Sequence, residues 1–321
     1  MNADMDKVVV ITINYNQNEC TFDCISSLLE SDYHDFNVVL IDNGPEPEHH
    51  TELIKWMDKK NDARLILKRL KKNLGYSGGI NYGLQFSTEL NPDYLMFMNN
   101  DAIIDNNSIS ELVRTCKKFN NKAIVSGKVY WYDKQDIIQN TGTVFKRLNK
   151  SPKPIGLNKK DIGQYDREAE RDMLDDVFWL FPFTLYKEIG DYSKYYWFNY
   201  QQADFVMRAK KKDYKLIYTP KAKIWHKSGA SIGGKINNPE KEYYSTQGSL
   251  IFTYLHFPLY DFIIHYLRVL SRFILAIIRY FMGKNSFKYA LAKILGVIYF
   301  HRWLFKRNEN SGNIPSIIKQ N

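Results

Sequence analysis

The chain has 321 residues, which is enough for one large domain or two ordinary ones. Its hydrophobic fraction of 44% and charged fraction of 25% are those of a globular protein and exclude an intrinsically disordered chain. The formal net charge is +10, but residues 262–307 contain nine Lys or Arg and no Asp or Glu. The charge therefore indicates a partner for the C-terminal segment, not for the whole protein.

The start of the chain does not resemble a secretory signal. Residues 1–7 are polar, and the apolar run that follows covers only Val8–Ile13. The three cysteines, Cys20, Cys24 and Cys116, are odd in number and lack the spacing of a metal site. Cys20 and Cys24 are one helical turn apart, and we expect them to be buried thiols of a reduced, cytoplasmic protein.

The first third of the chain alternates between strand and helix patterns. Short apolar runs, typical of strands buried on both faces, occur at residues 7–13, 37–42, 64–68 and 94–98. Helical patterns lie between them at residues 19–30, 48–60 and 76–88. This alternation predicts right-handed crossovers and an α/β fold with a mostly parallel sheet flanked by helices.

The middle of the chain is less regular. Residues 146–171 are polar and contain four Pro or Gly residues, so we expect a mobile loop over the sheet. Regular patterns resume at Val177. A helix is predicted at residues 201–212 and strands at 214–219 and 223–226.

From Leu250 onward, aromatic and aliphatic residues are interrupted by single basic residues. The longest apolar run, Phe273–Ile278, is far shorter than the roughly 20 residues that span a bilayer. Basic residues on one face and apolar residues on the other favour a helix lying in the membrane interface. The alternative is a helix packed on the preceding domain with its basic residues in solvent. We predict two domains, residues 1–249 and 250–321.

Asp101 marks the end of an apolar strand. The run Tyr94–Met98 stops at Asn99, Asn100 and Asp101. Ligands of open α/β sheets collect at the carboxyl ends of strands, and a lone carboxylate there suits a divalent cation carrying a diphosphate. The alternative is a simple Asx turn.

Two other strands end in short polar residues, and a glycine-rich segment opens the third helix. The polar groups are Asn14-Tyr-Asn16 and Asp42-Asn-Gly44, which are suited to holding a nucleotide base and ribose. In residues 72–79 the glycines allow the backbone to approach a phosphate at a helix N-terminus. This segment matches neither the dinucleotide fingerprint nor the P-loop. Each site alone could be a turn with a helix cap, but together the four favour a nucleotide site.

Five segments occur in the order VVVITINYNQ, LIDNG, KNLGYSGGINYG, YLMFMNNDAII and YKLIYTPKAKIWHKSGAS. Together they resemble the family 2 glycosyltransferases of GT-A fold, especially the rhamnosyltransferase-like branch of bacterial polysaccharide and O-antigen synthesis. The resemblance covers about residues 8–249. It implies a GT-A fold and the transfer of a sugar from a nucleotide diphosphate donor.

The resemblance also implies roles on the donor side of the site. Asn14 and Asn16 would lie at the nucleotide pocket, with Asp42 on the base or ribose. The phosphate side would be shaped by Asn73, Gly75 and Gly79.

The family's metal motif is commonly Asp-x-Asp, and its two ends fall on Asn99 and Asp101. Asn in the first position is common in this branch and leaves Asp101 as the anionic ligand. His226 matches a histidine that completes the metal or diphosphate site in some relatives. Its alternative is a core histidine that caps a strand.

Two departures from the family pattern concern the catalytic base. The family's acidic pair falls on Gln201 and Gln202, and an amide cannot remove a proton from the acceptor hydroxyl. Asp204 is retained, but it is displaced by two residues. Asp175 and Asp176 replace small residues of the acceptor region, so they are candidates for the base or for binding acceptor hydroxyls. We rank the base candidates Asp204, Asp176, Asp175.

We therefore predict a metal-dependent, inverting glycosyltransferase that uses Mg²⁺ or Mn²⁺. It would transfer a sugar from dTDP-rhamnose or a UDP-sugar to a lipid-linked oligosaccharide at the cytoplasmic face of the cell membrane. The alternative is a catalytically silent GT-A domain that binds nucleotide sugar or glycan as a scaffold. Nucleic-acid binding is not expected, because the basic excess lies among aliphatic and aromatic residues without a recognised nucleic-acid module.

Overall fold

The computed structural model describes residues 6–44, 46–145, 152–227, 238–284 and 286–319. Their internal contacts divide them into two compact units. The first unit comprises residues 1–73, 79–191 and 208–232, and the second comprises 74–78, 192–207 and 233–321. The second unit takes in the helix at residues 239–256, most of which the sequence places before the predicted boundary at residue 249.

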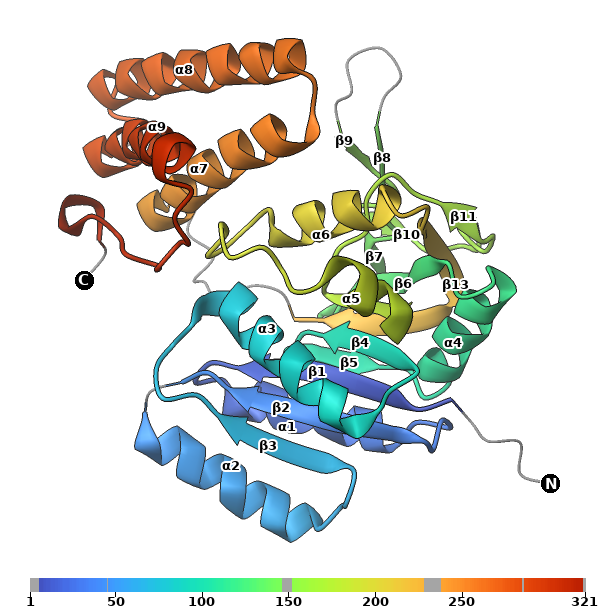
Figure 1. Ribbon diagram of the computed structural model, residues 1–321. Coiled ribbons are helices and arrows are strands. Elements are labelled where there is room, and N and C mark those ends of the chain that lie inside the picture. The colour runs from blue at the N-terminus through green and yellow to red at the C-terminus, as the bar shows by residue number, and fades with distance from the viewer. Residues whose placement is uncertain (1–5, 45, 146–151, 228–237, 285, 320–321) are drawn as a thin grey trace. The chain divides into compact units, whose positions relative to one another are not determined.

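The N-terminal part of the first unit is a parallel sheet with strand order β4-β1-β2-β3 (Figure 1). The strands are β1 (Val8–Asn14), β2 (Phe36–Asp42), β3 (Leu65–Arg69) and β4 (Tyr94–Met98). They alternate with α1 (Asn18–Leu29), α2 (Pro47–Lys60) and α3 (Gly75–Ser87), and a short 3-10 helix, η1 (Thr88–Leu90), precedes β4. The predicted parallel sheet with flanking helices is confirmed.

Side-chain alternation along β1 explains how the helices cover the sheet. Val8 and Val10 join a core cluster that also contains buried residues of α1 and α2. On the other face, Ile11 and Ile13 contact α3 so closely that only glycine fits opposite them: a Cβ at Gly83 would lie 2.5 Å from Ile11 Cγ2. Because successive strand residues point to opposite faces, β1 is buried on both sides.

The rest of the sheet is mixed. The strand β12 (Phe178–Pro182) runs antiparallel to β4 and also pairs with β6 (Ala123–Trp131). β6 is followed by its antiparallel neighbour β7 (Lys134–Asn140). The remaining elements of this part are β5 (Ala102–Ile104), α4 (Ser108–Lys118), α5 (Phe183–Ile189) and β13 (Lys215–His226). β13 runs parallel to β6 and antiparallel to β5.

Two sequence predictions for this region need correction. The two strands predicted at 214–219 and 223–226 form one strand, β13, with an irregularity in its pairing with β6 between Tyr218 and Lys223. Pro220 lies at this irregularity, where a residue without an N–H is tolerated. The predicted loop at 146–171 contains short strands: β9 (Pro152–Pro154), which pairs with β8 (Thr143–Phe145), then β10 (Lys159–Lys160) and β11 (Ala169–Glu170). Residues 146–151 of that prediction lie outside the described residues.

The second unit is largely helical. It contains most of α6 (Gln201–Lys210), followed by α7 (Pro239–His256), α8 (Leu259–Phe281), α9 (Phe287–Lys306) and a short 3-10 helix, η2 (Ser316–Ile318). The three long helices pack against one another pairwise, and Gly296 allows α9 to approach Thr246 of α7 (Figure 1). None of the helices in the described ranges combines the length and apolarity needed to cross a membrane.

The irregularity in β13 generates a prediction about stability. A Cβ at Gly127 of β6 would lie 2.1 Å from the carbonyl oxygen of Ala222 and 2.7 Å from the Phe178 ring. Because moving a backbone atom would distort the paired strand, Gly127→Ala should lower the free energy of unfolding by about 1–3 kcal/mol. Urea denaturation measures this free energy. The control Gln135→Ala, at an exposed position of β7, should change it by less than about 0.5 kcal/mol. Equal stability of the two variants would contradict the close approach.

Candidate active site

The polar residues that end β1, β2 and β4 lie at one edge of the sheet. In the β1–β2 register Asn14 is opposite Asp42, and in the β2–β3 register Asp42 is opposite Arg69. β4 lies on the other side of β1 and ends at Met98, directly before Asn99. The carboxyl ends of these parallel strands therefore meet, as expected for a ligand site of an open α/β sheet.

Asn14 is fully buried and its amide is used within the protein. Its Nδ2 donates to Asn18 Oδ1 at 2.8 Å, and its Oδ1 accepts from the backbone N–H of Gln17 at 3.0 Å and from Thr21 Oγ1 at 3.1 Å. These bonds fix the start of α1 against the end of β1. The structure thus gives Asn14 a positioning role beside the site.

Asp42 and Asn16 occupy the neighbouring part of this edge. Asp42 is buried, with Oδ2 2.6 Å from His50 Nδ1 and 4.0 Å from Arg69 Nε. Asn16 has a left-handed backbone with φ +55°, and its buried Oδ1 has no hydrogen-bond partner in the part of the chain that the structure describes. An unpaired buried acceptor is costly, so binding of a donor group here would be favourable. Gly44 faces this oxygen, since a Cβ there would lie only 2.2 Å away.

The three residues expected on the phosphate side have different structural roles. Asn73 accepts a hydrogen bond from Asn43 Nδ2 at 3.1 Å, which ties it to the end of β2. Gly79 brings α3 against β1, where a Cβ would lie 2.9 Å from Ile13 Cδ1. Gly75 belongs to the second unit, where its positive φ of +70° and its contact with the Trp197 ring require glycine.

Asp101 and His226 form a buried pair. The distance from Asp101 Oδ1 to His226 Nε2 is 3.0 Å, and Asn99 Nδ2 lies 3.4 Å from the same ring nitrogen. The antiparallel register between β5 and β13 sets this geometry, because Ala102 lies directly opposite His226. The structure therefore brings together the three residues that the sequence predicts around the metal.

Gln139 defines the chemistry of this pair. Its Oε1 lies 2.8 Å from His226 Nδ1, so Nδ1 carries the proton of that hydrogen bond. In the neutral ring, Nε2 then presents a lone pair to the carboxylate oxygen of Asp101. Two acceptors at this distance repel unless a proton or a cation lies between them. Nothing in the local sequence around Gln139 indicates this contact, which arises from the pairing of β7 with β6.

The residues present fit a divalent cation whose coordination is completed by substrate. A carboxylate oxygen and an imidazole nitrogen are both ligands of Mn²⁺. Within the described ranges, no group of three or more His, Cys, Asp or Glu side chains could hold a metal. The protein would supply few ligands, and diphosphate oxygens and water would supply the others, which is a common arrangement for such ions.

Lys227 adds a positive charge beside this pair. Its backbone N–H donates to the Asp101 carbonyl oxygen at 2.9 Å, and its Nζ lies 2.8 Å from Asp23 Oδ2. A lysine ammonium is a common partner for phosphate groups. No motif in the sequence indicates this lysine, although it directly follows His226.

The three candidate bases have different surroundings. Asp175 reaches solvent, but the protein around its carboxyl group disfavours the ionised form and raises its pKa, an effect that a protonated His226 would oppose. Asp176 is buried, and the backbone N–H groups of Asp176 and Val177 donate to the Asp175 carboxyl group. Asp204 belongs to the second unit and is also buried, with Oδ1 2.7 Å from His256 Nε2. The pairing with His256 has no signal in the sequence pattern.

A largely parallel sheet with flanking helices, polar strand ends and a buried Asp–His pair at the same edge fits a nucleotide-diphospho-sugar transferase fold of GT-A type. The comparisons with known proteins agree. Residues 9–189 match the family described as Glycosyl transferase family 2, and this match covers more than half of the chain. The chain belongs to the family 2 glycosyltransferases.

The curated relatives are polysaccharide synthases. Poly-beta-1,6-N-acetyl-D-glucosamine synthase of Staphylococcus epidermidis is 23% identical over 223 residues, which are 68% of this chain and 50% of the relative. The protein of that name from Staphylococcus aureus (strain COL) is 22% identical over 239 residues, 73% of this chain and 53% of the relative. The chain spans about half the length of the curated relatives it matches.

Two solved structures share the fold. GalNAc-T7, crystallised with UDP, GalNAc and Mn²⁺, superposes with a TM-score of 0.59 at 12% identity, covering 94% of this chain and 59% of the other. S. aureus TarS 1-349, in complex with UDP-GlcNAc, superposes with a TM-score of 0.51 at 15% identity, covering 77% and 66%. At these identities the likeness shows the fold alone.

The raised pKa of Asp175 predicts an unusual response to mutation. A carboxyl group whose pKa is raised by folding lowers stability above that pKa, and this cost disappears as the pH falls below the ordinary Asp value. Asp175→Asn should therefore raise the melting temperature relative to the wild type at pH 8, with a smaller gain at pH 5, measured by calorimetry.

The matched control is Asp133→Asn, at an exposed position in the turn between β6 and β7, which should leave the melting temperature nearly unchanged at both pH values. A lower melting temperature for Asp175→Asn at pH 8 would show that the ionised carboxylate is favoured by its surroundings. That result would contradict the account of Asp175.

Proposed function

We propose that the protein transfers one sugar from a nucleotide diphosphate donor to a hydroxyl group of a glycan acceptor in cell-surface polysaccharide synthesis. Family membership and the names of the curated relatives support this reaction. The observation that carries it is the Asp101–His226 pair, at the same sheet edge as the polar ends of β1 and β2. The departing diphosphate develops negative charge, so a cation is needed at this edge of the sheet.

The transfer depends on Mg²⁺ or Mn²⁺ held at Asp101 and His226. A divalent cation there would neutralise the charge of the departing diphosphate. Asn99 lies against His226, and Gln139 fixes the tautomer that leaves Nε2 available to the ion. Lys227 directly follows His226 and would supply a second positive charge to the phosphates by exchanging its ion pair with Asp23. The Mn²⁺ in the GalNAc-T7 structure is consistent with this arrangement.

The donor is a UDP-sugar or dTDP-rhamnose, and the comparisons favour the first. Both structural neighbours contain UDP or a UDP-sugar, whereas rhamnose rests on the family resemblance alone. Asn16 and Asp42 would contact the base or ribose, because one offers an unpaired oxygen and the other ends β2 at the same edge. Asn14 shapes this pocket through its bonds to α1.

Asp175 is the best candidate for the general base. Its carboxyl group lies within electrostatic range of His226, and its raised pKa makes it a stronger proton acceptor than an ordinary aspartate. It would take the proton of the acceptor hydroxyl while that oxygen attacks the anomeric carbon and the diphosphate leaves with inversion. Asp176 would assist by orienting it. We place Asp204 last, because its carboxylate is already paired with His256.

The acceptor is a lipid-linked oligosaccharide, and the protein works at the cytoplasmic membrane surface. Support comes from α8, whose exposed side chains include Leu259, Leu267 and Phe281. A helix that presents large apolar residues to water together with basic residues is suited to the membrane interface.

A catalytically silent scaffold is the second candidate. It is favoured by Gln201 and Gln202, whose buried Oε1 atoms have no hydrogen-bond partner among the residues described. Amide oxygens can accept hydrogen bonds from glycan hydroxyls but cannot act as a base at neutral pH.

Donor binding and turnover of Asp101→Asn test the proposed function. With Mn²⁺ present, one donor of a nucleotide-sugar panel should raise the melting temperature of the wild type, because a ligand of the folded state stabilises it. Asp101→Asn should lose the Mn²⁺-dependent part of this shift. Its donor turnover should fall by about a hundredfold.

The control Asp105→Asn lies just after β5 in the same chain segment and should keep both properties. Full activity of Asp101→Asn would contradict the metal site. Donor binding by the wild type without turnover on any lipid-linked acceptor would favour the scaffold.

A further inference from the structure

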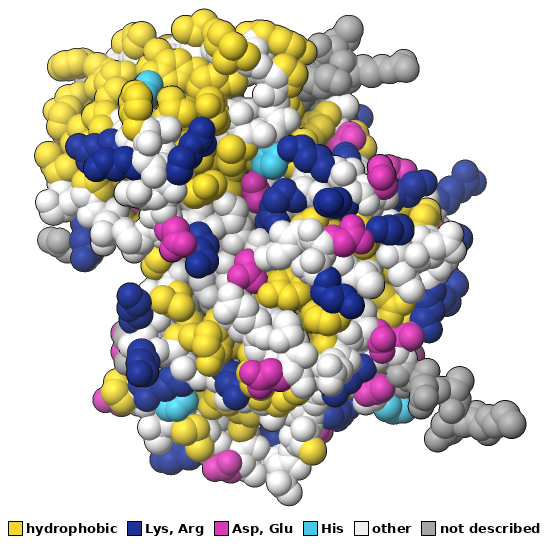
Figure 2. All heavy atoms as spheres, viewed as in Figure 1, with side chains coloured by type: hydrophobic (Ala, Val, Ile, Leu, Met, Phe, Trp, Pro, Cys, Tyr) yellow, Lys and Arg dark blue, Asp and Glu magenta, His cyan; other side chains and the backbone are white. Residues whose placement is uncertain are grey.

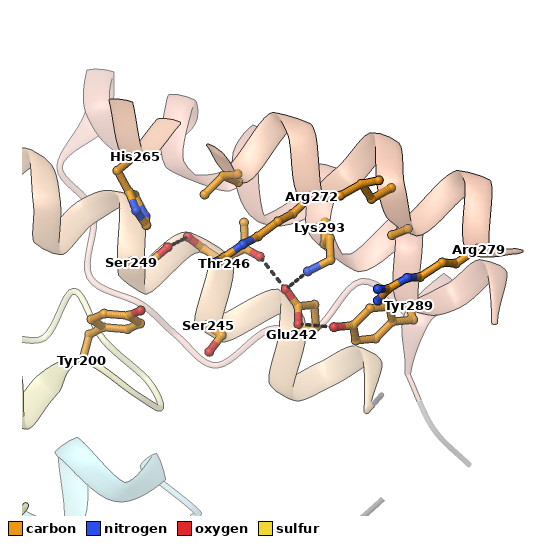
Figure 3. Close-up of a pocket in the computed structure, with 13 residues that line it drawn as sticks. Tyr200, Glu242, Ser245, Thr246, Ser249, His265, Arg272, Arg279, Tyr289 and Lys293 are labelled. Carbon is orange, nitrogen blue, oxygen red and sulfur yellow. Dashed lines mark hydrogen bonds and ion pairs between the residues drawn. The ribbon is translucent and has the colours of Figure 1, made fainter. Parts of the chain in front are cut away.

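The helical unit contains a pocket of about 480 Å³ between α7, α8 and α9 (Figure 3). This volume lies in the range of small-ligand sites. Its polar lining includes Glu242 of α7, His265, Arg272 and Arg279 of α8, and Tyr289 and Lys293 of α9. All of these residues belong to the second unit, so the pocket is defined without reference to the donor site.

The only carboxylate in this lining is already satisfied. Glu242 forms a short ion pair with Lys293 and accepts hydrogen bonds from Tyr289 OH at 2.8 Å and Thr246 Oγ1 at 3.2 Å (Figure 3). Arg272 and Arg279 have no carboxylate partner in the described part of the chain. The pocket therefore carries two uncompensated guanidinium groups.

His265 lines the same pocket as these arginines. Burial and the charges of Arg272 and Arg268 lower the pKa of its imidazole. Its buried Nε2 has no hydrogen-bond partner among the residues described. An anion in the pocket would compensate the arginine charges, and the arginine fork matches phosphate oxygens in bidentate geometry.

The opposite face of α8 is apolar and exposed. Ile263, Leu267, Ile274, Ile278 and Phe281 recur at helical spacing, with exposed fractions from 48% to 81%. Figure 2 shows hydrophobic side chains gathered over these helices, with Lys and Arg next to them. A helix that lies in the membrane interface buries its apolar face at the acyl boundary, so its polar face lies near the depth of the lipid phosphates.

We propose that the pocket between α7, α8 and α9 binds the phosphate group of an anionic membrane lipid. Arg272 and Arg279 are its cationic ligands, and the exposed face of α8 contacts the acyl chains. The charge of the pocket on one side of α8 and the apolar face on its other side together select a phosphate that is attached to a lipid. This site rests on the membrane association in the proposed function, but not on the transfer reaction.

Vesicle binding by the full-length chain tests the site. The wild type is compared on phosphatidylcholine vesicles with and without phosphatidic acid, by co-sedimentation. Phosphatidic acid should tighten binding by about tenfold or more, and Arg272→Gln with Arg279→Gln should remove most of this gain. The matched control, Arg302→Gln with Lys306→Gln, removes the same charge from exposed positions of α9 outside the pocket. This control should keep most of the gain in binding.

Competition tests the wild type without any substitution. A short-chain, soluble phosphatidic acid should displace the protein from the vesicles, whereas inorganic phosphate at the same concentration should not. Displacement by inorganic phosphate would overturn the lipid assignment in favour of a free-phosphate site. The two double variants could also lose vesicle binding equally, at unchanged melting temperatures. That result would show that general surface charge causes the binding, and it would contradict a lipid site in the pocket.

Two further measurements distinguish a failure of the lipid site from a failure of the proposed function. Absence of wild-type binding to either vesicle would overturn membrane association and the lipid site together. The nucleotide-sugar thermal shift of the arginine variant, measured in parallel, should equal that of the wild type. Loss of that shift would show that the substitutions disturb the donor site and would contradict an independent pocket.

Discussion

The site depends on the contact between Asp101 and His226. These residues are distant in the sequence and meet because β13 pairs with β5 so that His226 lies opposite Ala102. Gln139, from β7, fixes the ring proton on the far side of the imidazole. The pair thus presents a carboxylate oxygen and a nitrogen lone pair toward one another. These two acceptors repel each other unless a cation or a proton lies between them.

Other polar residues at this edge divide into those already bonded and those open to a ligand. Asn14 has its donors and acceptors committed to α1, whereas His50 holds the Asp42 carboxylate in place and leaves it further acceptor positions. Asn16 Oδ1 has no partner among the described residues. A rigid internal network beside a few unsatisfied groups is what preorganised binding requires, because the bonded residues hold the open ones in place.

Much of the fold could be predicted because its signals are local. The apolar runs of β1 to β4 and the helices between them are visible in the sequence, as is the family pattern that includes Asp101. The place of β12 beside β4, the continuity of β13 across Pro220, and the contacts of Gln139 and His256 could not be predicted. Each depends on pairing between distant segments, for which a short motif carries no information.

Electron–nuclear double resonance of bound Mn²⁺ tests the central claim, that Asp101 and His226 share the donor's cation. With Mn²⁺ and UDP present, the account predicts a nitrogen hyperfine coupling in the wild type that disappears in His226→Gln. Nitrogen ligation of this kind is expected only if the imidazole Nε2 faces the ion. Tight Mn²⁺ and UDP binding without any nitrogen coupling in the wild type would contradict the account.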